Sequence, residues 1–170
     1  MLRSRQTGLT LTELMVAVVI AGLLMTVGVN SYSRWTQNQQ VRVAAESILN
    51  GIQLARGEAV KRNTSVRFVL AGQSSWTVIE AAGGVAIQAR SEQEGSRNAT
   101  TTPTPGNAAT ITFNGMGRVI ANADGSATLA QVDVGNPRGD RPLRITIGVG
   151  GSVRMCDPSP QLQAGDPRAC

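Results

Sequence analysis

The chain has 170 residues, with 16 basic and 11 acidic side chains and a formal net charge of +5. That length suits one domain with an added anchor segment. Aromatic residues make up only 3% of the chain, so a core must be built from Val, Ile, Leu and Ala. The chain contains no histidine, which removes the commonest general base and the usual metal ligand. We therefore expect neither an enzyme nor a cofactor or metal site.

A long apolar segment lies near the N-terminus. No charged residue occurs between Glu13 and Arg34, which leaves 20 uncharged residues in a row. As a helix, at about 1.5 Å per residue, this segment is about 30 Å long and matches the hydrocarbon thickness of a bilayer. Arg3 and Arg5 precede it and are expected on the cytoplasmic side. Glu13 is the unusual residue, because an ionisable group in a spanning helix is costly without a partner.

Three interpretations of this segment are open. A secretory signal peptide would be cut after the apolar run, where Gly28 and Ser31 are small but no A-x-A-like site occurs. A plain signal anchor fits the hydropathy but gives no reason for Gly8 or Glu13. In the third interpretation the cut falls after Gly8, and Leu9 becomes the new N-terminus.

The start of the chain resembles a known family. Gly8 is followed by Leu-Thr-Leu-Thr-Glu, which ends at Glu13, and then by the apolar run. This pattern resembles the class III leader of type IV pilins and type II secretion pseudopilins. The resemblance implies that a prepilin peptidase cuts after Gly8 and methylates the new amino group of Leu9. Family members usually have Phe at the first mature position and Ile at the fourth, where this chain has Leu9 and Thr12.

The resemblance also implies a role for Glu13 in assembly. Its carboxylate would neutralise the buried α-amine of Leu9, on the same helix or on that of a neighbouring subunit. Pairing between subunits would favour assembly, because an unpaired Glu13 is costly in lipid. The alternative is that Glu13 lies at the level of the lipid headgroups and costs little there.

The helical pattern continues beyond the apolar run. Small and aliphatic residues recur at spacings of three and four, which is typical of one helix face; they are Val41, Ala45, Ile48, Ile52, Ala55 and Ala59. No proline occurs between Leu9 and Asn63. We predict one helix of about 50 residues that packs on a small sheet, with a coiled coil as the alternative. The expected organisation is a leader at 1–8, a transmembrane or filament-core helix half at 9–30, an amphipathic half at 31–63 and a β-rich head at 64–170.

The rest of the chain is predicted to be rich in strands. Segments with β-branched residues, separated by turn signals, are 65–71, 75–81, 85–90, 110–114, 118–121, 127–134 and 142–149. Residues 92–107 are polar and are expected to form a mobile loop. Residues 122–126 are expected to form a tight hairpin turn. The predicted fold class is α+β, with the helix packed on an antiparallel sheet.

Two further segments narrow the resemblance. Residues 111–119 contain Phe113, Gly117 and Arg118 and resemble the F-x-x-x-G hairpin of the GspH/FimT/FimU minor pilins. Residues 54–62 resemble the conserved helix end of that family, with Gly57 where Ser is usual. The resemblance implies the type IV pilin fold and, as partners, other minor pilins, the major pilin, the prepilin peptidase, the inner membrane and the pilus assembly platform. It implies an inner-membrane, single-pass protein with a periplasmic head, which later moves into a filament at the cell surface.

Cys156 and Cys170 are the only cysteines. An even pair in an exported domain is typical of a disulfide bond. The 15-residue ring would contribute about 3 kcal/mol in the loop-entropy model and would hold the C-terminal loop beside the last strand. Two cysteines without histidine are too few ligands for a zinc site. The disulfide favours a pilus over a secretion pseudopilus, because pili work outside the cell, although the periplasm also oxidises thiols.

Arginines gather late in the chain. The candidate DNA-binding residues are Arg138, Arg141, Arg144, Arg154 and Arg168, since guanidinium groups bind backbone phosphates. Competence-associated relatives use a C-terminal Gly-Arg-x-Arg, whereas residues 151–154 here read Gly-Ser-Val-Arg. Four aspartates lie among these arginines, so the alternative is an ordinary solvated face.

These observations favour a minor pilin of a type IV pilus, placed in the tip or priming complex that initiates pilus assembly for twitching, adhesion or DNA uptake. Three alternatives stay open: a minor pseudopilin of GspH type in type II secretion, a DNA-binding minor pilin for natural transformation, and an anchored periplasmic monomer that never assembles. Only the last would tolerate Glu13→Leu.

Overall fold

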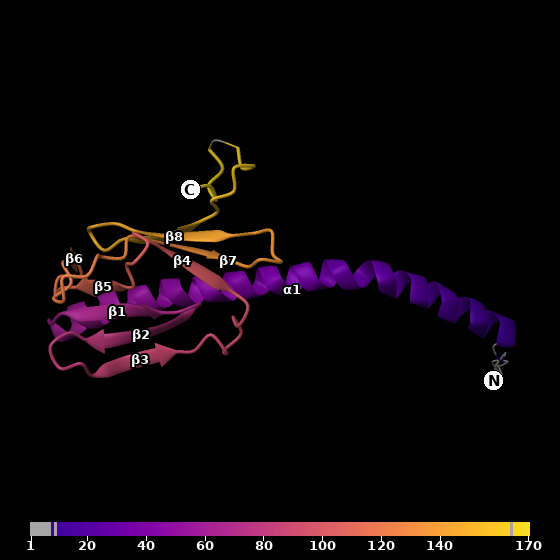
Figure 1. Ribbon diagram of the computed structural model, residues 1–170, viewed down its shortest axis with the longest axis horizontal. Coiled ribbons are helices and arrows are strands. Elements are labelled where there is room, and N and C mark those ends of the chain that lie inside the picture. Colours follow the sequence, from indigo (N-terminus) through magenta and orange to yellow (C-terminus); the bar gives the residue numbers. More distant parts are fainter. Residues whose placement is uncertain (1–7, 9, 164) are drawn as a thin grey trace, which may run out of the picture.

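The computed structural model describes residue 8, residues 10–163 and residues 165–170 (Figure 1). Arg3, Arg5 and Leu9 lie outside the described residues. The chain folds into one long helix, α1 (Leu11–Arg62, 52 residues), followed by nine strands. Figure 1 shows that the second half of α1 lies within the head, whereas its first half extends well beyond the head. The predicted helix of about 50 residues is therefore confirmed.

Local signals define both ends of α1. Thr10 caps the N-terminus in an extended conformation, and Glu13 completes a capping box with it. At the C-terminus Asn63 adopts a left-handed conformation (φ 49°), and its N–H donates to the carbonyl oxygens of Ala59 and Val60. Lys61 and Arg62 lie in the last turn, where their positive charges interact favourably with the negative end of the helix dipole.

The first half of α1 is apolar and exposed. Among the described residues, no straight helix is by itself long and apolar enough to cross a membrane. Two segments of α1 are long and apolar enough only when they are taken together, Leu11–Thr26 and Ser31–Arg62, and the helix bends by 40° between them. Large apolar side chains project from the first segment with more than half of their surface exposed: Leu11, Leu14, Met15, Val16, Val18, Val19, Ile20, Leu23, Leu24 and Met25.

The head contains two antiparallel sheets. The first has the order β3-β2-β1-β5-β6, formed by β1 (Val66–Ala71), β2 (Ser75–Glu80), β3 (Ala86–Arg90), β5 (Thr110–Phe113) and β6 (Val119–Ile120). The second has the order β4-β7-β8-β9, formed by β4 (Thr100–Thr104), β7 (Gln131–Gly135), β8 (Leu143–Ile147) and β9 (Val153–Cys156). Both sheets contact α1, and Figure 1 shows β2 and β3 below the helix and β7 and β8 above it in this view.

The core lies between α1 and the two sheets. The predicted helix face is buried in full, with at most 1% of the surface exposed at Val41, Ala45, Ile48, Ile52, Ala55 and Ala59. Small residues let the sheet approach closely: a Cβ at Gly51 would lie 2.8 Å from the Phe68 ring and 2.9 Å from the Trp76 ring. The amphipathic pattern therefore identified the packing face correctly, and the helix forms a spine for the head instead of a coiled coil within this chain.

The β5–β6 hairpin explains the F-x-x-x-G pattern. Phe113 is fully buried in the core and pairs with Val119 across the hairpin. Gly117 has a φ of +71°, a conformation that side chains other than glycine rarely adopt. A Cβ at Gly117 would also lie 3.0 Å from the side chain of Val60 on α1, so this glycine lets the hairpin close onto the end of the helix.

The structure of the head differs from the sequence-based expectations in four respects. The helix packs on two sheets, whereas one was expected. Residues 92–107 are not a loop throughout, because β4 lies within them and pairs with β7 from Thr100–Gly135 to Thr104–Gln131. Residues 122–126 form a turn, with Ser126 N–H donating to Asp124 Oδ1 at 2.9 Å; that turn leads from the first sheet to the second and does not close a hairpin. The strand β9 had also not been predicted.

Candidate functional site

The N-terminal end of α1 gives Glu13 a partner in its own chain. The backbone N–H of Thr10 donates to Glu13 Oε2 at 2.9 Å, and the Thr10 hydroxyl donates to the same oxygen at 2.7 Å. The backbone N–H of Glu13 donates in return to Thr10 Oγ1 at 3.3 Å. The carboxylate is thereby held at the positive end of the helix dipole. Glu13 thus has a second role, as part of the helix cap. This role was not predicted, although the pattern Thr-x-x-Glu of a capping box is visible in the sequence.

The predicted processing site lies just before this cap. Gly8 is exposed, and no neighbouring atom lies within 4 Å of the position that a Cβ would take there. Leu9 lies outside the described residues. The predicted pairing of Glu13 with an α-amine at Leu9 therefore stays a prediction, and the capping box with Thr10 is the interaction that the structure shows.

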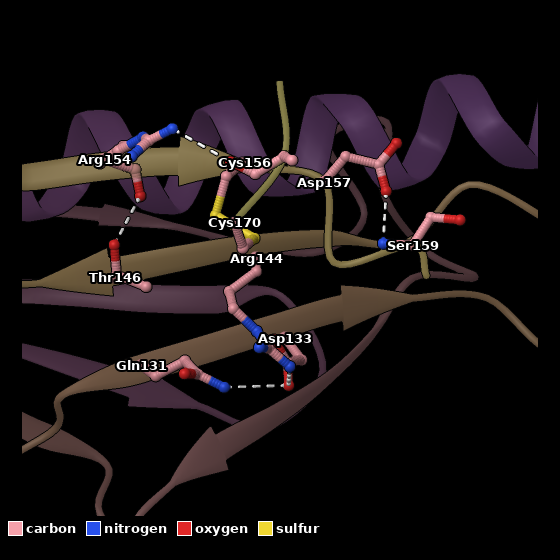
Figure 2. Close-up of a disulfide and its surroundings, with 10 residues drawn as sticks. Gln131, Asp133, Arg144, Thr146, Arg154, Cys156, Asp157, Ser159 and Cys170 are labelled. Atoms are coloured by element: carbon pink, nitrogen blue, oxygen red, sulfur yellow. Dashed lines mark hydrogen bonds and ion pairs between the residues drawn. A yellow bond between two sulfur atoms is a disulfide. The ribbon is translucent and has the colours of Figure 1, made fainter. Parts of the chain in front are cut away.

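The C-terminal disulfide is present as predicted. Cys156, at the end of β9, is bonded to Cys170, with 5.1 Å between their Cα atoms (Figure 2). Backbone hydrogen bonds close the ring beside the strand, from Asp157 N–H to the Arg168 carbonyl (2.7 Å) and from Cys170 N–H to the Asp157 carbonyl (3.2 Å). The end of the C-terminal loop (157–170) is thus folded back on its start, and the disulfide joins it to β9.

The structure divides the five candidate arginines into two groups. Arg144 and Arg154 lie on β8 and β9, and Figure 2 shows both on the same part of the second sheet. Arg144 donates two hydrogen bonds to Asp133, at 2.6 and 3.0 Å, and this bidentate contact raises the pKa of Arg144. Arg154 donates to the carbonyl of Ala169 at 3.0 Å. Both arginines of this group therefore already have hydrogen-bond partners within the head.

The remaining arginines lie in loops. Arg168 donates two hydrogen bonds to Asp166, at 2.8 and 3.1 Å. These bonds lower the pKa of the Asp166 carboxyl to about 2. Arg138 and Arg141, between β7 and β8, form no ion pair with any residue that the structure describes. They are the members of the candidate set that are free to bind an external phosphate.

Sequence reasoning missed a second feature of the helix, close to the end of the apolar run. Tyr32 and Trp35 are exposed, and their ring centroids lie 5.9 Å apart. The signal was available, because Trp and Tyr gather at the interfaces of membranes and this chain has one Tyr and two Trp in all. Within the described residues, no cluster of three or more Cys, Asp or Glu side chains is arranged to hold a metal ion.

Comparisons with known proteins agree with this geometry. The family model described as type II transport protein GspH matches residues 44–163, and the model of the prokaryotic N-terminal methylation motif matches residues 3–29. Among curated proteins, no sequence gives a significant match.

Two solved structures share the fold. The type IV minor pilin FimU of Pseudomonas aeruginosa aligns with a TM-score of 0.54 and 16% identity, over 71% of this chain and 91% of FimU. The minor pseudopilin EpsH from the type 2 secretion system of Vibrio cholerae aligns with a TM-score of 0.50 and 14% identity, over 70% of this chain and 98% of EpsH. At these identities the likeness establishes the fold alone.

Proposed function

This chain belongs to the GspH family of pilin-like proteins, and we propose from that premise that it is a minor pilin of a type IV pilus. Members of this family are structural subunits of type IV pili and type II secretion systems, and pilin-family proteins assemble with other pilins in filaments. In our proposal the subunit is stored in the inner membrane and then enters the tip or priming complex that initiates the filament.

The observation that carries the proposal is the exposed first half of α1. This half extends beyond the head (Figure 1), and its apolar side chains have few neighbours within the chain. Together with the N-terminal methylation motif at residues 3–29, it fits a membrane-anchored pilin. Burying a Leu, Ile or Val side chain that is otherwise exposed contributes about 1.5–3 kcal/mol, so this segment is stable only in lipid or against the helices of other subunits.

The same helix suits transfer from the membrane to a filament. Lipid tails are as apolar as the side chains of neighbouring helices, so moving from one to the other changes the hydrophobic energy little. The charge of Glu13 therefore determines whether the helix is more stable in the membrane or in the filament. The hydrogen bonds from Thr10 leave the negative charge of Glu13 without a counter-ion, which is unfavourable in lipid, and an α-amine supplied at Leu9 of a neighbouring subunit would compensate that charge.

Analysis of the N-terminus tests the proposal. The chain is purified from membranes of its own host, and its intact mass and N-terminal sequence are determined. We expect a start at Leu9 and one additional methyl group. A start at Met1, or a cut after the apolar run, would contradict processing as a pilin.

The alternative is a minor pseudopilin of type II secretion, and the match of residues 44–163 to the family model described as type II transport protein GspH favours this second candidate. Deleting the gene separates the two. We expect loss of surface pili with normal protein secretion. Normal pili combined with accumulation of secreted proteins in the periplasm would assign the chain to the secretion system.

A further inference from the structure

We propose that a groove between α1 and the C-terminal loop binds the phosphate headgroup of a membrane phospholipid while the subunit is stored, an inference that rests on the proposed function. One wall of this helix–loop groove is the face of α1 from Ser31 to Arg42. The other wall consists of the β7–β8 loop, the ends of β8 and β9, and part of the C-terminal loop. The volume of the groove is about 790 Å³, which is enough for a headgroup and the start of its acyl chains.

The groove offers arginines without internal partners. Four arginines line it: Arg34, Arg42, Arg141 and Arg168. Arg42 pairs with Glu46 at 2.8 Å, and Arg168 pairs with Asp166 at 2.8 Å. In the part of the chain that the structure describes, Arg34 and Arg141 have no ion pair. A guanidinium group matches the oxygens of a phosphate with paired hydrogen bonds, so these two side chains are the proposed ligands.

The groove lies at the height of the headgroups when the apolar run spans the membrane. Arg34 follows Glu13 by 21 residues, and at about 1.5 Å per residue the separation is about 30 Å, one hydrocarbon thickness. Tyr32 and Trp35 flank Arg34 and are 68% and 58% exposed. Aromatic side chains at this position are typical of the membrane interface. The head first covers the helix just beyond, since Val41 is buried.

The lining of the groove favours a phospholipid over a nucleic acid. Asp140 and Asp157 also line the groove, and their charge opposes a polyanion such as DNA, whereas it tolerates a headgroup that carries an ammonium group beside its phosphate. Leu143 and Met155 contribute apolar surface, which suits the glycerol and the first methylenes of a lipid. A headgroup bound here would set the depth of the stored subunit and the orientation of its head.

Tryptophan fluorescence of the full chain in detergent tests the inference. Trp76 is buried, with 3% of its surface exposed, whereas Trp35 lines the groove and is exposed, so a spectral change on adding lipid reports mainly on Trp35. Short-chain phosphatidylethanolamine is titrated into the micelles, with diacylglycerol, which lacks the phosphate, as the parallel titrant. We expect a saturable blue shift with the phospholipid and none with diacylglycerol.

Paired variants identify the ligands. The double variant Arg34→Gln/Arg141→Gln is expected to raise the half-saturating lipid concentration about tenfold or more, because charge-assisted hydrogen bonds to the phosphate are lost. The matched control Arg97→Gln/Arg118→Gln removes the same charge from exposed positions outside the groove and is expected to behave as the wild type. Equal midpoints for the two double variants, or an equal response to diacylglycerol, would overturn the inference.

Two further measurements distinguish the headgroup site from a nucleic-acid site and from a failure of membrane anchoring. A DNA duplex that displaces the phospholipid at a lower phosphate concentration would assign the groove to nucleic acid and overturn the inference. Membrane flotation is carried out on the wild type and on the Arg34→Gln/Arg141→Gln variant, and both are expected to float because the apolar helix is unchanged. A wild type that does not float would contradict the proposed function itself, whereas flotation without phosphate-dependent fluorescence would contradict only the headgroup site.

Discussion

The indole N–H of Trp76 donates a hydrogen bond to the hydroxyl of Ser47, 2.8 Å away, and both side chains are buried. Trp76 lies on β2 and Ser47 on α1, so this bond joins the first sheet to the helix at the centre of the head. The Trp76 ring also packs on Phe68, with 5.8 Å between the ring centroids. The aromatic residues of this head are few, and two of them meet here.

The first prediction concerns this bond. Ser47→Ala leaves the buried indole N–H without a partner, and we expect the free energy of unfolding to fall by about 1–3 kcal/mol. Thermal unfolding of the detergent-solubilised chain measures the change. Ser33→Ala is the control, because Ser33 is exposed on the same helix and its loss is expected to change stability by less than about 0.5 kcal/mol. Equal stability of the two variants would contradict a role for the bond.

The second prediction concerns the disulfide. Cys156→Ser combined with Cys170→Ser opens the 15-residue ring and is expected to lower the free energy of unfolding by about 3 kcal/mol. Dithiothreitol should have the same effect on the wild type and none on the double variant. Because the disulfide and the hydrogen bond from Arg154 to the Ala169 carbonyl join the end of the C-terminal loop to β9, proteolysis is expected to cut first within residues 157–170 once the disulfide is lost. An unchanged melting temperature after reduction would contradict this prediction.

The helix and its buried face could be predicted because their signals are local. The spacing of Val41, Ala45 and Ile48 and the absence of proline identify an amphipathic helix from a short window of sequence. The disulfide needed only a count of two cysteines. The strand β4 gave no such signal: it is polar and contains Pro103, which excludes a central strand but is tolerated at a sheet edge. Its pairing with β7 depends on residues about 30 positions away.

The distribution of partners at the surface could not be predicted for a similar reason. Arg144 and Asp133 are 11 residues apart and meet only because β7 and β8 are paired in that register. The groove joins Arg34 to Arg141, which are more than 100 positions apart in the sequence. The sequence therefore shows which arginines lie near the C-terminus, whereas the register of the strands determines which of them have an ion-pair partner within the chain.

The third prediction concerns acid stability. Hydrogen bonds from Arg168 lower the pKa of Asp166 from 3.8 to about 2 in the folded chain. Because the folded pKa lies below the unfolded value, the stabilising contribution is complete above about pH 4 and is lost as the pH falls from 4 toward 2. In Arg168→Gln the pKa of Asp166 should return toward 3.8, which NMR titration of its carboxyl carbon would measure. An Asp166 pKa that is the same in both proteins would contradict the ion pair.

The fourth prediction concerns DNA. We predict that any affinity of this chain for DNA depends on Arg138 and Arg141, because Arg144 is already bound to Asp133. In gel-shift titrations at several salt concentrations, Arg138→Gln/Arg141→Gln should lower the salt slope by about two, roughly one for each phosphate contact. Arg144→Gln and Arg154→Gln should leave the slope unchanged. A loss of slope in these single variants would place the contact on β8 and β9 instead.

The last prediction separates two roles of Glu13. A glutamine at this position can keep the capping box with Thr10, since its side-chain oxygen still accepts from the Thr10 N–H, but it carries no charge for an α-amine. If the charge drives assembly, Glu13→Gln should lower incorporation into sheared filaments about as strongly as Glu13→Leu. The variant Thr10→Ala loses the capping hydroxyl but retains the carboxylate of Glu13, so it should assemble nearly as well as the wild type. Immunoblots of filament and membrane fractions measure the ratio. Normal incorporation of Glu13→Gln together with loss in Thr10→Ala would mean that the carboxylate acts through the helix cap alone, and normal incorporation of Glu13→Leu would remove Glu13 from assembly altogether.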